Sequence, residues 1–307
     1  MSVQLIMRPQ DVPLTWEQFI KQTKPFAIAI DGYVADGPID QLAGPRCNFN
    51  HHERVHRLAT RSTCEQILIA IRLGLFNLFK NENGQIQMDV YANDCDEDVC
   101  LSWFLLSKGF MAEHVIHPLL NRLVNMEGAL DATAGAFPFP ISLPVLEELA
   151  WIFDPYRRLR LSGELYKKNP ETFKSVVTDV SLRIQQHLAG QGDRLPLNTK
   201  YETTYRGQGW VMVKEHGPQA RTGMFSDGIT AFVSVSQGPG QNWTYSVGRQ
   251  SSFIPFNVPA ILNALNEAEE ATDDRWGGSD IIGGSPRVKG SKLNPDKVIK
   301  IIDGLIN

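Results

Sequence analysis

Short apolar runs alternate with segments of helical apolar spacing along the chain. Residues 26–30 are all apolar and end at Asp31, which is typical of a buried strand. Further strands are predicted at 46–50 and 86–92, and a helix is predicted at 63–80. This alternation predicts an α/β fold, with a mostly parallel sheet flanked by helices.

A second group of segments predicts the organisation of the rest of the chain. Helices are predicted at 15–23, 99–108, 117–130, 143–154, 170–189 and 258–271 and from Pro295 onward, and strands at 209–214, 228–235 and 242–248. Residues 189–198 have the glycine, proline and polar composition of a linker. We therefore expect a first domain at 1–192, with a helical insertion at about 136–192, and a smaller C-terminal α/β domain at 200–307.

Composition narrows the classes of protein. The 307 residues are 42% hydrophobic and 21% charged, which is ordinary for a globular chain. A net charge of −4 gives no overall attraction to duplex DNA or an anionic membrane, so small anions are the better partners. No apolar run approaches the roughly 20 residues of a membrane span, and we expect a soluble cytoplasmic protein.

Four cysteines lie in the first third of the chain, at Cys47, Cys64, Cys95 and Cys100. They lack the paired two-residue spacings of a structural zinc site. Reduced thiols in the core are the better interpretation.

Acidic residues and histidines follow each of the first three predicted strands. They are Asp31, His51, His52, Asp94, Asp96 and Asp98. Strand ends and helix starts converge at one edge of a parallel sheet, where ligands commonly bind. A mixture of carboxylates and imidazoles suits manganese, iron or zinc.

Each part of this pattern also has an ordinary explanation. Acidic residues are favoured at a helix start by the helix dipole, and adjacent histidines occur on surfaces and in cores. We interpret His56 as a surface residue. Asp98 favours a metal, because a third carboxylate within five residues adds repulsion that a cation would relieve.

Two segments resemble the DHH phosphoesterase superfamily. Residues 93–102, NDCDEDVCLS, are similar to its strand-to-helix aspartate motif, with Asp96 and Asp98 as the closest matches. Residues 49–53, FNHHE, resemble its Asp-His-His signature, although Asn50 replaces the aspartate and so loses a charge. The order of the two motifs is permuted relative to the family.

The resemblance implies a metal site and a group of catalytic residues. The implied ligands of one or two divalent ions, with Mn²⁺ preferred, are Asp31, His51, His52, Asp94, Asp96, Asp98 and Asp131. Among them, His51, His52 and Asp98 would be catalytic. For Asp131, a solvent-exposed helix end is the alternative.

A glycine-rich segment near the C-terminus is similar to the motif of the DHH-associated substrate domain. In residues 276–287, WGGSDIIGGSPR, Ser279 stands where the family often has histidine. The implied phosphate-binding residues are Gly277, Gly278, Ser279, Gly283, Gly284, Ser285, Arg287 and Arg249. The alternative is a tight surface loop.

The leading hypothesis is hydrolysis of a small phosphoester or phosphoanhydride by a metal-activated water. The substrate would be a nucleotide, a short single-stranded oligonucleotide or a similar molecule. Asn50 and Ser279 favour an alternative, a catalytically weakened nucleotide- or phosphate-binding protein of the same fold. A third hypothesis is a metal-dependent hydrolase that acts on another bond. Whether the chain forms a homodimer stays open.

Overall fold

The computed structural model describes residues 2–108, 117–133, 135–238, 240–272, 274–286 and 289–306. The chain forms two compact units, which are Met1–Ala132 with Glu147–Leu195, and Thr133–Leu146 with Pro196–Asn307. Segment 133–146 therefore belongs with the second unit, whereas the sequence pattern placed it in the first. Its Ala136 is buried in a core cluster with Val211 and Phe225, which explains the difference.

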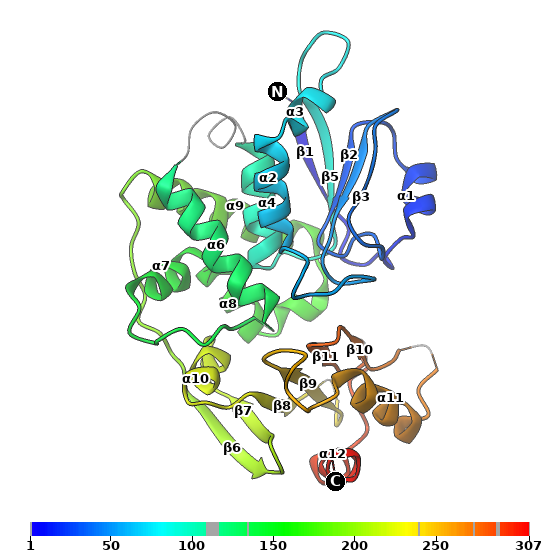
Figure 1. The fold of residues 1–307 in the computed structure, drawn as a ribbon, viewed down its shortest axis with the longest axis vertical. Helices are drawn as coiled ribbons and strands as arrows, with labels where there is room; N and C mark the ends of the chain where they lie inside the picture. Colours follow the sequence, from blue (N-terminus) through cyan, green and yellow to red (C-terminus); the bar gives the residue numbers. More distant parts are fainter. Residues whose placement is uncertain are drawn as a thin grey trace. The chain divides into compact units, whose positions relative to one another are not determined.

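The sheet of the first unit has the strand order β1-β5-β2-β4-β3 (Figure 1). Its strands are β1 (Ser2–Met7), β5 (Gln87–Ala92), β2 (Ala27–Ile30), β4 (Arg46–Phe49) and β3 (Ile39–Gln41). All neighbours pair in parallel except β3, which runs antiparallel to β4. The prediction of a mostly parallel sheet in an α/β fold is confirmed for this unit.

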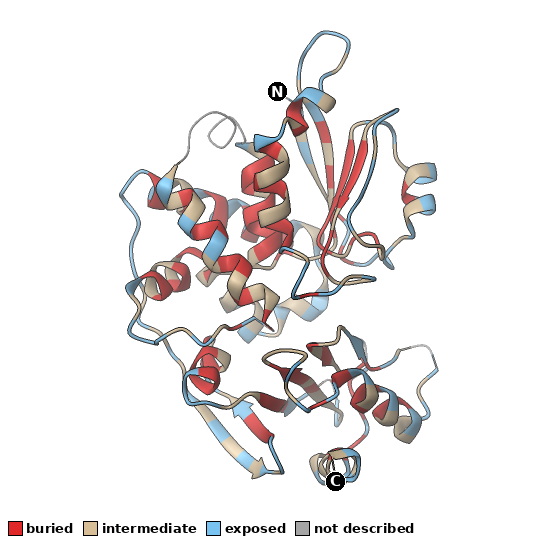
Figure 2. Cartoon of the chain, viewed as in Figure 1, coloured by how far each residue is buried: buried red, intermediate tan, exposed pale blue. Residues whose placement is uncertain are grey.

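Helices cover both faces of this sheet (Figure 1). Helix α1 (Trp16–Gln22) packs Phe19 against Ala27 and Ala29 of β2. The other face is covered by α2 (Thr63–Arg72), α4 (Glu97–Ser107) and α9 (Pro170–Leu188). Strand β2 is buried on both faces, as expected for a central parallel strand (Figure 2).

The remaining helices of this unit differ from the prediction in two places. They are α3 (Leu75–Leu78), α6 (Pro118–Ala132), α7 (Pro144–Ile152), α8 (Asp154–Leu161) and a 3₁₀ helix at Glu164–Lys167, with α7 shared between the two units. The helix predicted at 63–80 is interrupted at Gly74, whose φ of 102° is left-handed. Helix α8 was not predicted.

The second unit has a mixed sheet of order β10-β11-β9-β8-β7-β6. Its strands are β6 (Tyr201–Arg206), β7 (Val211–Glu215), β8 (Ala231–Gln237), β9 (Trp243–Arg249), β10 (Gly277–Gly278) and β11 (Ile282–Gly284). Among the strands described in this unit, β7 and β8 pair in parallel and the other neighbours are antiparallel. Its helices are α10 (Ala220–Ser226), α11 (Val258–Glu269) and α12 (Pro295–Ile306).

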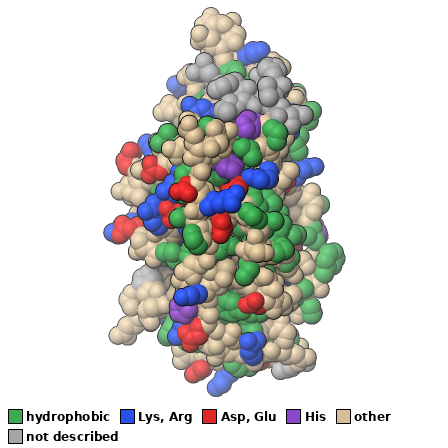
Figure 3. Space-filling view, turned by 90° about the vertical axis from the view of Figure 1, so that its left-hand side faces the viewer, with side chains coloured by type: hydrophobic (Ala, Val, Ile, Leu, Met, Phe, Trp, Pro, Cys, Tyr) green, Lys and Arg blue, Asp and Glu red, His purple; other side chains and the backbone are tan. Residues whose placement is uncertain are grey.

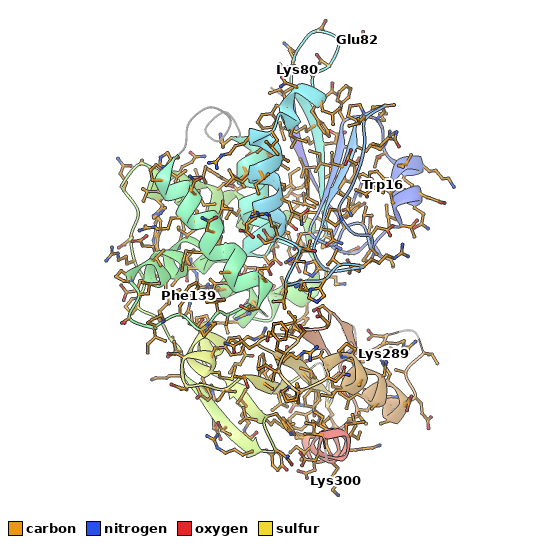
Figure 4. All side chains as sticks on the ribbon, in the orientation of Figure 1. Trp16, Lys80, Glu82, Phe139, Lys289 and Lys300 are labelled. Atoms are coloured by element: carbon orange, nitrogen blue, oxygen red, sulfur yellow. The ribbon has the colours of Figure 1, made fainter. Side chains whose placement is uncertain are left out.

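Helix α12 shows how apolar spacing positions the C-terminal helices of this unit. Val298 and Ile302 are buried in a core cluster, whereas Lys300 points to solvent (Figure 4). The same cluster includes Ile261 and Leu265 of α11. The helices predicted at 258–271 and from Pro295 are confirmed.

Surface charge is mixed in sign. Lys and Arg side chains lie among Asp and Glu side chains on the face drawn in Figure 3. Ion pairs such as that between Arg122 and Glu148 contribute to this pattern. Within the ranges given above, no helix is both long and apolar enough to cross a bilayer.

Candidate metal centre

Parallel pairing of β2 with β4 brings Asp31 and the two histidines together. Asp31 directly follows β2. Strand β4 is followed by Asn50 and then by His51 and His52. The Asp31 amide donates to the Phe49 carbonyl at 2.9 Å, which extends the pairing to the end of the strands. Asp31 has a φ of 49°, a left-handed conformation that aspartate tolerates better than most side chains.

Two helices complete the site with carboxylates. Asp98 lies in the first turn of α4, and Asp131 lies in the last turn of α6. Nε2 of the fully buried His51 is 2.7 Å from Asp131 Oδ2, 3.5 Å from Asp31 Oδ1 and 3.8 Å from Asp98 Oδ2. His52 Nε2 is 2.9 Å from Asp31 Oδ1. We call these five residues the carboxylate-histidine cluster.

Three atoms of the cluster are left without aligned hydrogen bonds. They are both ring nitrogens of His51 and Oδ2 of Asp131, which are buried and have no hydrogen-bond partner among the described residues, although Nε2 and Oδ2 form an ion pair at 2.7 Å. Buried polar atoms in native proteins are nearly always bonded. The ligand atoms of Asp31, His51 and His52 lie within 4.8 Å of one another, as do those of His51, Asp98 and Asp131. Each group could hold a metal ion.

Charge at the cluster is unbalanced toward acid. Burial acts to lower the pKa of His51, but the carboxylates of Asp131 and Asp31 raise this pKa to about 10. Burial and repulsion from Asp31 and Asp131 raise the pKa of Asp98 to about 7. A proton on His51 therefore partly compensates the carboxylates, and a metal cation would replace it.

The start of α2 also faces the cluster. The amides of Thr63 and Cys64 each donate to the Asp98 carboxylate at 2.7 Å. The Thr63 hydroxyl donates to Asp31 Oδ1 at 3.0 Å. The positive end of a helix thus supports two of the buried carboxylates and holds them in place.

Asn50 shapes the loop that carries the histidines. Its Oδ1 accepts the amides of His51 and His52 at 2.8 and 3.1 Å. Its Nδ2 donates to backbone carbonyls of loop 34–36 and to the Glu53 carboxylate. An aspartate could not make the donor contacts, so asparagine suits this fully buried position.

Asp94 and Asp96 lie beside the cluster and outside both groups of converging ligand atoms. Asp96 is the N-cap of α4 and accepts the Val99 amide at 2.9 Å. Burial, followed by repulsion from Asp31 and Asp94, raises the pKa of Asp96 well above its usual range. The hydrogen bond of Asp96 is therefore that of an N-cap residue. Its carboxylate also lies close enough to Asp31 for the two negative charges to repel each other.

Sequence reasoning missed two buried charged residues next to the cluster. Arg57 is 3% exposed and contacts the His52 ring and the Asp131 carbonyl. Glu127 is 4% exposed and precedes Asp131 by four residues on α6. The four-residue spacing places Glu127 on the same face of α6 as Asp131, so the sequence could have indicated that it lies near the cluster. No comparable spacing indicates Arg57.

In the second unit, the glycine-rich hairpin uses most of its polar side chains internally. Ser279 Oγ accepts the amides of Ile281 and Ile282, each at 3.2 Å. Ser285 Oγ accepts the Tyr245 amide at 3.0 Å. Both hydroxyls therefore hold the hairpin together.

Close packing explains three of the four glycines. A Cβ on Gly278 would lie 2.3 Å from Gly283 Cα, and one on Gly283 would lie 2.4 Å from Leu262 Cδ1. A Cβ on Gly284 would lie 3.1 Å from the Tyr245 carbonyl oxygen. Only Gly277 has open space around it, and it is exposed.

Of the two arginines expected to hold phosphate, Arg249 makes its hydrogen bonds inside the second unit. Arg249 donates through Nε to the Asp280 carbonyl at 2.8 Å, and through Nη1 to the carbonyls of Ser252 and Ile254. It therefore ties the hairpin to a neighbouring loop. Arg287 lies outside the described residues.

Comparisons of the chain with models of protein families, with curated proteins and with solved structures found no match. The resemblance to DHH phosphoesterases stays a prediction from the motifs. The geometry of the carboxylate-histidine cluster is therefore the basis for a functional hypothesis.

Proposed function

We propose that the protein is a metal-dependent hydrolase of small phosphoesters or phosphoanhydrides. The observation that supports this best is His51 Nε2, which faces the buried carboxylates of Asp31 and Asp98 and the partly exposed one of Asp131 without an aligned hydrogen bond. A stable core does not need such an arrangement, because converging like charges destabilise it. A bound cation would explain why the arrangement exists.

Asp31, His51, Asp98 and Asp131 are the residues that would hold the ion. Mn²⁺ suits their mixture of carboxylate and imidazole ligands. When bound, such an ion lowers the pKa of water and neutralises charge on a phosphoryl group. Asp94 and Asp96, beside the cluster, would help to hold a second ion.

His52 is the most accessible of the two histidines. Its side chain is 35% exposed, whereas that of His51 is fully buried. In this proposal its Nε2 hydrogen bonds to a phosphoryl oxygen of the substrate. The buried residues Thr63 and Asn50 would keep the carboxylates and the histidine loop in place before substrate arrives.

The two replacements that motivate the binding-protein alternative also have structural roles. Asn50 is used to shape the histidine loop, and Ser279 is used to close the hairpin turn. Neither replacement removes an atom from the cluster. Nucleotides and short oligonucleotides remain the proposed substrates, and a cytoplasmic location and a homodimer stay predictions.

The experiment measures Mn²⁺-dependent release of nitrophenol from mono- and bis-nitrophenyl phosphate. We compare the wild-type protein with His51→Gln, and use His56→Gln as the matched control because His56 is exposed. We expect His51→Gln to lose about 100-fold or more of the activity and His56→Gln to retain it. Equal activity in all three folded proteins, or none in the wild type with any divalent ion, would contradict the proposal.

A further inference from the structure

A buried arginine connects the histidine loop to helix α6. Arg57 lies between β4 and α2 and is 3% exposed. Its Nη2 donates to the Asp131 carbonyl at 2.6 Å, and its Nη1 lies 3.4 Å from the His51 carbonyl. The same Nη1 is 3.1 Å from Nδ1 of the His52 ring.

The contact with His52 has only one possible direction. A guanidinium has donors and no acceptor, and it does not lose its proton in proteins. His52 Nδ1 must therefore be the acceptor, so it carries no proton. A neutral imidazole that accepts at Nδ1 carries its proton on Nε2.

The other side of the His52 ring agrees with this assignment. Nε2 lies 2.9 Å from Asp31 Oδ1, and an ionised carboxylate only accepts hydrogen bonds. Asp31 Oδ1 also accepts the Thr63 hydroxyl at 3.0 Å, so this oxygen acts as an acceptor. The ring thus has a donor on one side and an acceptor on the other.

We propose that Arg57 is a positioning residue that fixes His52 in the tautomer with its proton on Nε2. His52 then presents an N–H donor to the site and has no lone pair there for a metal. The tautomer assignment rests on the contacts of Arg57 and Asp31 alone. Its consequence for catalysis rests on the proposed function.

Arg57 therefore separates the roles of the two histidines. Both belong to groups of side chains that could hold an ion. Arg57 touches His51 only at its carbonyl oxygen, which leaves the imidazole of His51 free to bind through Nε2. The ligand set contracts to Asp31, His51, Asp98 and Asp131, and His52 remains for the substrate.

Histidine ring NMR tests the assignment directly. Protein labelled with ¹⁵N-histidine is examined above the ordinary histidine pKa of about 6.5, and His52→Gln identifies the signals. We expect the wild-type protein to show only the Nε2–H form of His52, before and after addition of the diamagnetic ion Zn²⁺. A proton on Nδ1, a mixture of tautomers or a Zn²⁺ ion bound to His52 Nε2 would overturn the proposal.

Two substitutions of Arg57 show whether this residue is the cause. Arg57→Lys keeps a donor-only cation, so we expect it to retain the wild-type tautomer. Arg57→Met removes the donor, so we expect the Nδ1–H form to appear and His52 to become a Zn²⁺ ligand. Unchanged His52 signals in a folded Met variant would overturn the proposal, whether or not metal binds.

The proposed function fails by a different result. Absence of any Zn²⁺-induced change at the His51 signals of the wild-type protein contradicts the metal centre. The His52 tautomer in the metal-free protein is measured independently of that result. If the Met variant does not fold, the wild-type spectrum still decides the assignment.

Discussion

The carboxylate-histidine cluster and the glycine-rich hairpin use their polar atoms in opposite ways. In the cluster, His51 Nε2 and Asp131 Oδ2 are buried without aligned partners, and three carboxylates converge. In the hairpin, Ser279 and Ser285 bond to backbone amides. Both regions were predicted to be functional because each resembles a motif of the same superfamily. Of the two, only the cluster has buried side-chain atoms without hydrogen bonds among the described residues.

This difference shows what separates a functional motif from a structural one. Buried polar groups cost free energy unless they are bonded, so a group of unbonded ones that converge is a candidate site for a ligand. The serine hydroxyls of the hairpin bond to backbone amides, and three of its four glycines are required by close packing. These residues therefore need no ligand to account for them. Among the described glycines and serines of the hairpin, the exposed Gly277 is the one left for a phosphate.

The largest expected effect is on metal affinity. Asp31→Asn should weaken Mn²⁺ binding by about 100-fold or more, because it removes a charged ligand from the cluster. Asp40→Asn is the matched control, since Asp40 is an exposed carboxylate on β3. Isothermal titration calorimetry measures both variants, and equal affinities would place the metal elsewhere.

The dependence of metal affinity on pH should be the next largest effect. In the metal-free protein the carboxylates hold the pKa of His51 at about 10, so His51 is protonated at neutral pH. A cation must displace this proton, so affinity should rise by about tenfold per pH unit between pH 8 and the pKa. Calorimetry in buffers of different ionisation enthalpy should also show proton release, and its absence would mean that His51 is not a ligand.

Asn50→Asp tests the histidine loop. A carboxylate cannot donate to the carbonyls of loop 34–36, and it would repel Glu53. We expect the free energy of unfolding in urea to fall by about 1–3 kcal/mol, while Asn125→Asp on the exposed face of α6 changes it little. Stronger metal binding with unchanged stability would instead favour the ligand role that the family motif suggests.

A smaller effect is expected at the hairpin. Ser279→Ala should lower the free energy of unfolding by about 1 kcal/mol, because two amides lose their acceptor. Gly277→Ala should leave stability nearly unchanged, since a Cβ there meets open space. If the hairpin binds phosphate, only Gly277→Ala should weaken the binding, and the reverse result would assign the ligand contact to the serine.

The smallest effect concerns Asp96. Its raised pKa means that its negative charge destabilises the metal-free fold, and asparagine keeps the N-cap while removing that charge. Asp96→Asn should therefore raise the free energy of unfolding above that pKa, and the gain should shrink as the pH falls below it and vanish near the ordinary aspartate pKa of about 3.9. Thermal unfolding with a chelator present measures the change, and a destabilised variant at neutral pH would contradict this explanation.

Much of the fold could be predicted from the sequence because apolar runs and helical spacing carry that information. The buried strands β2, β4 and β5 were predicted within one or two residues of their observed ends. Strands β1 and β6 were missed because their residues are half-exposed and alternate with polar ones. The break at Gly74 depends on a single left-handed residue inside an otherwise helical pattern.

The site was predictable only where its residues follow strands. Asp31, His51 and His52 come together because β2 and β4 pair in parallel; the pattern predicted a mostly parallel sheet, but not which strands are neighbours. The contacts of Arg57 and Asn50 were not predictable, because each joins segments that the sequence does not place side by side. Such tertiary contacts decide which of the predicted ligands actually converge.

Anomalous diffraction from crystals grown with Mn²⁺ tests the central claim most directly. The account predicts an anomalous peak about 2.0–2.3 Å from His51 Nε2 and from carboxylate oxygens of Asp31, Asp98 and Asp131. A second peak beside Asp94 or Asp96 would extend the site to two ions. A structure with saturating Mn²⁺, no peak at the cluster and His51 Nε2 hydrogen-bonded to Asp131 would contradict it.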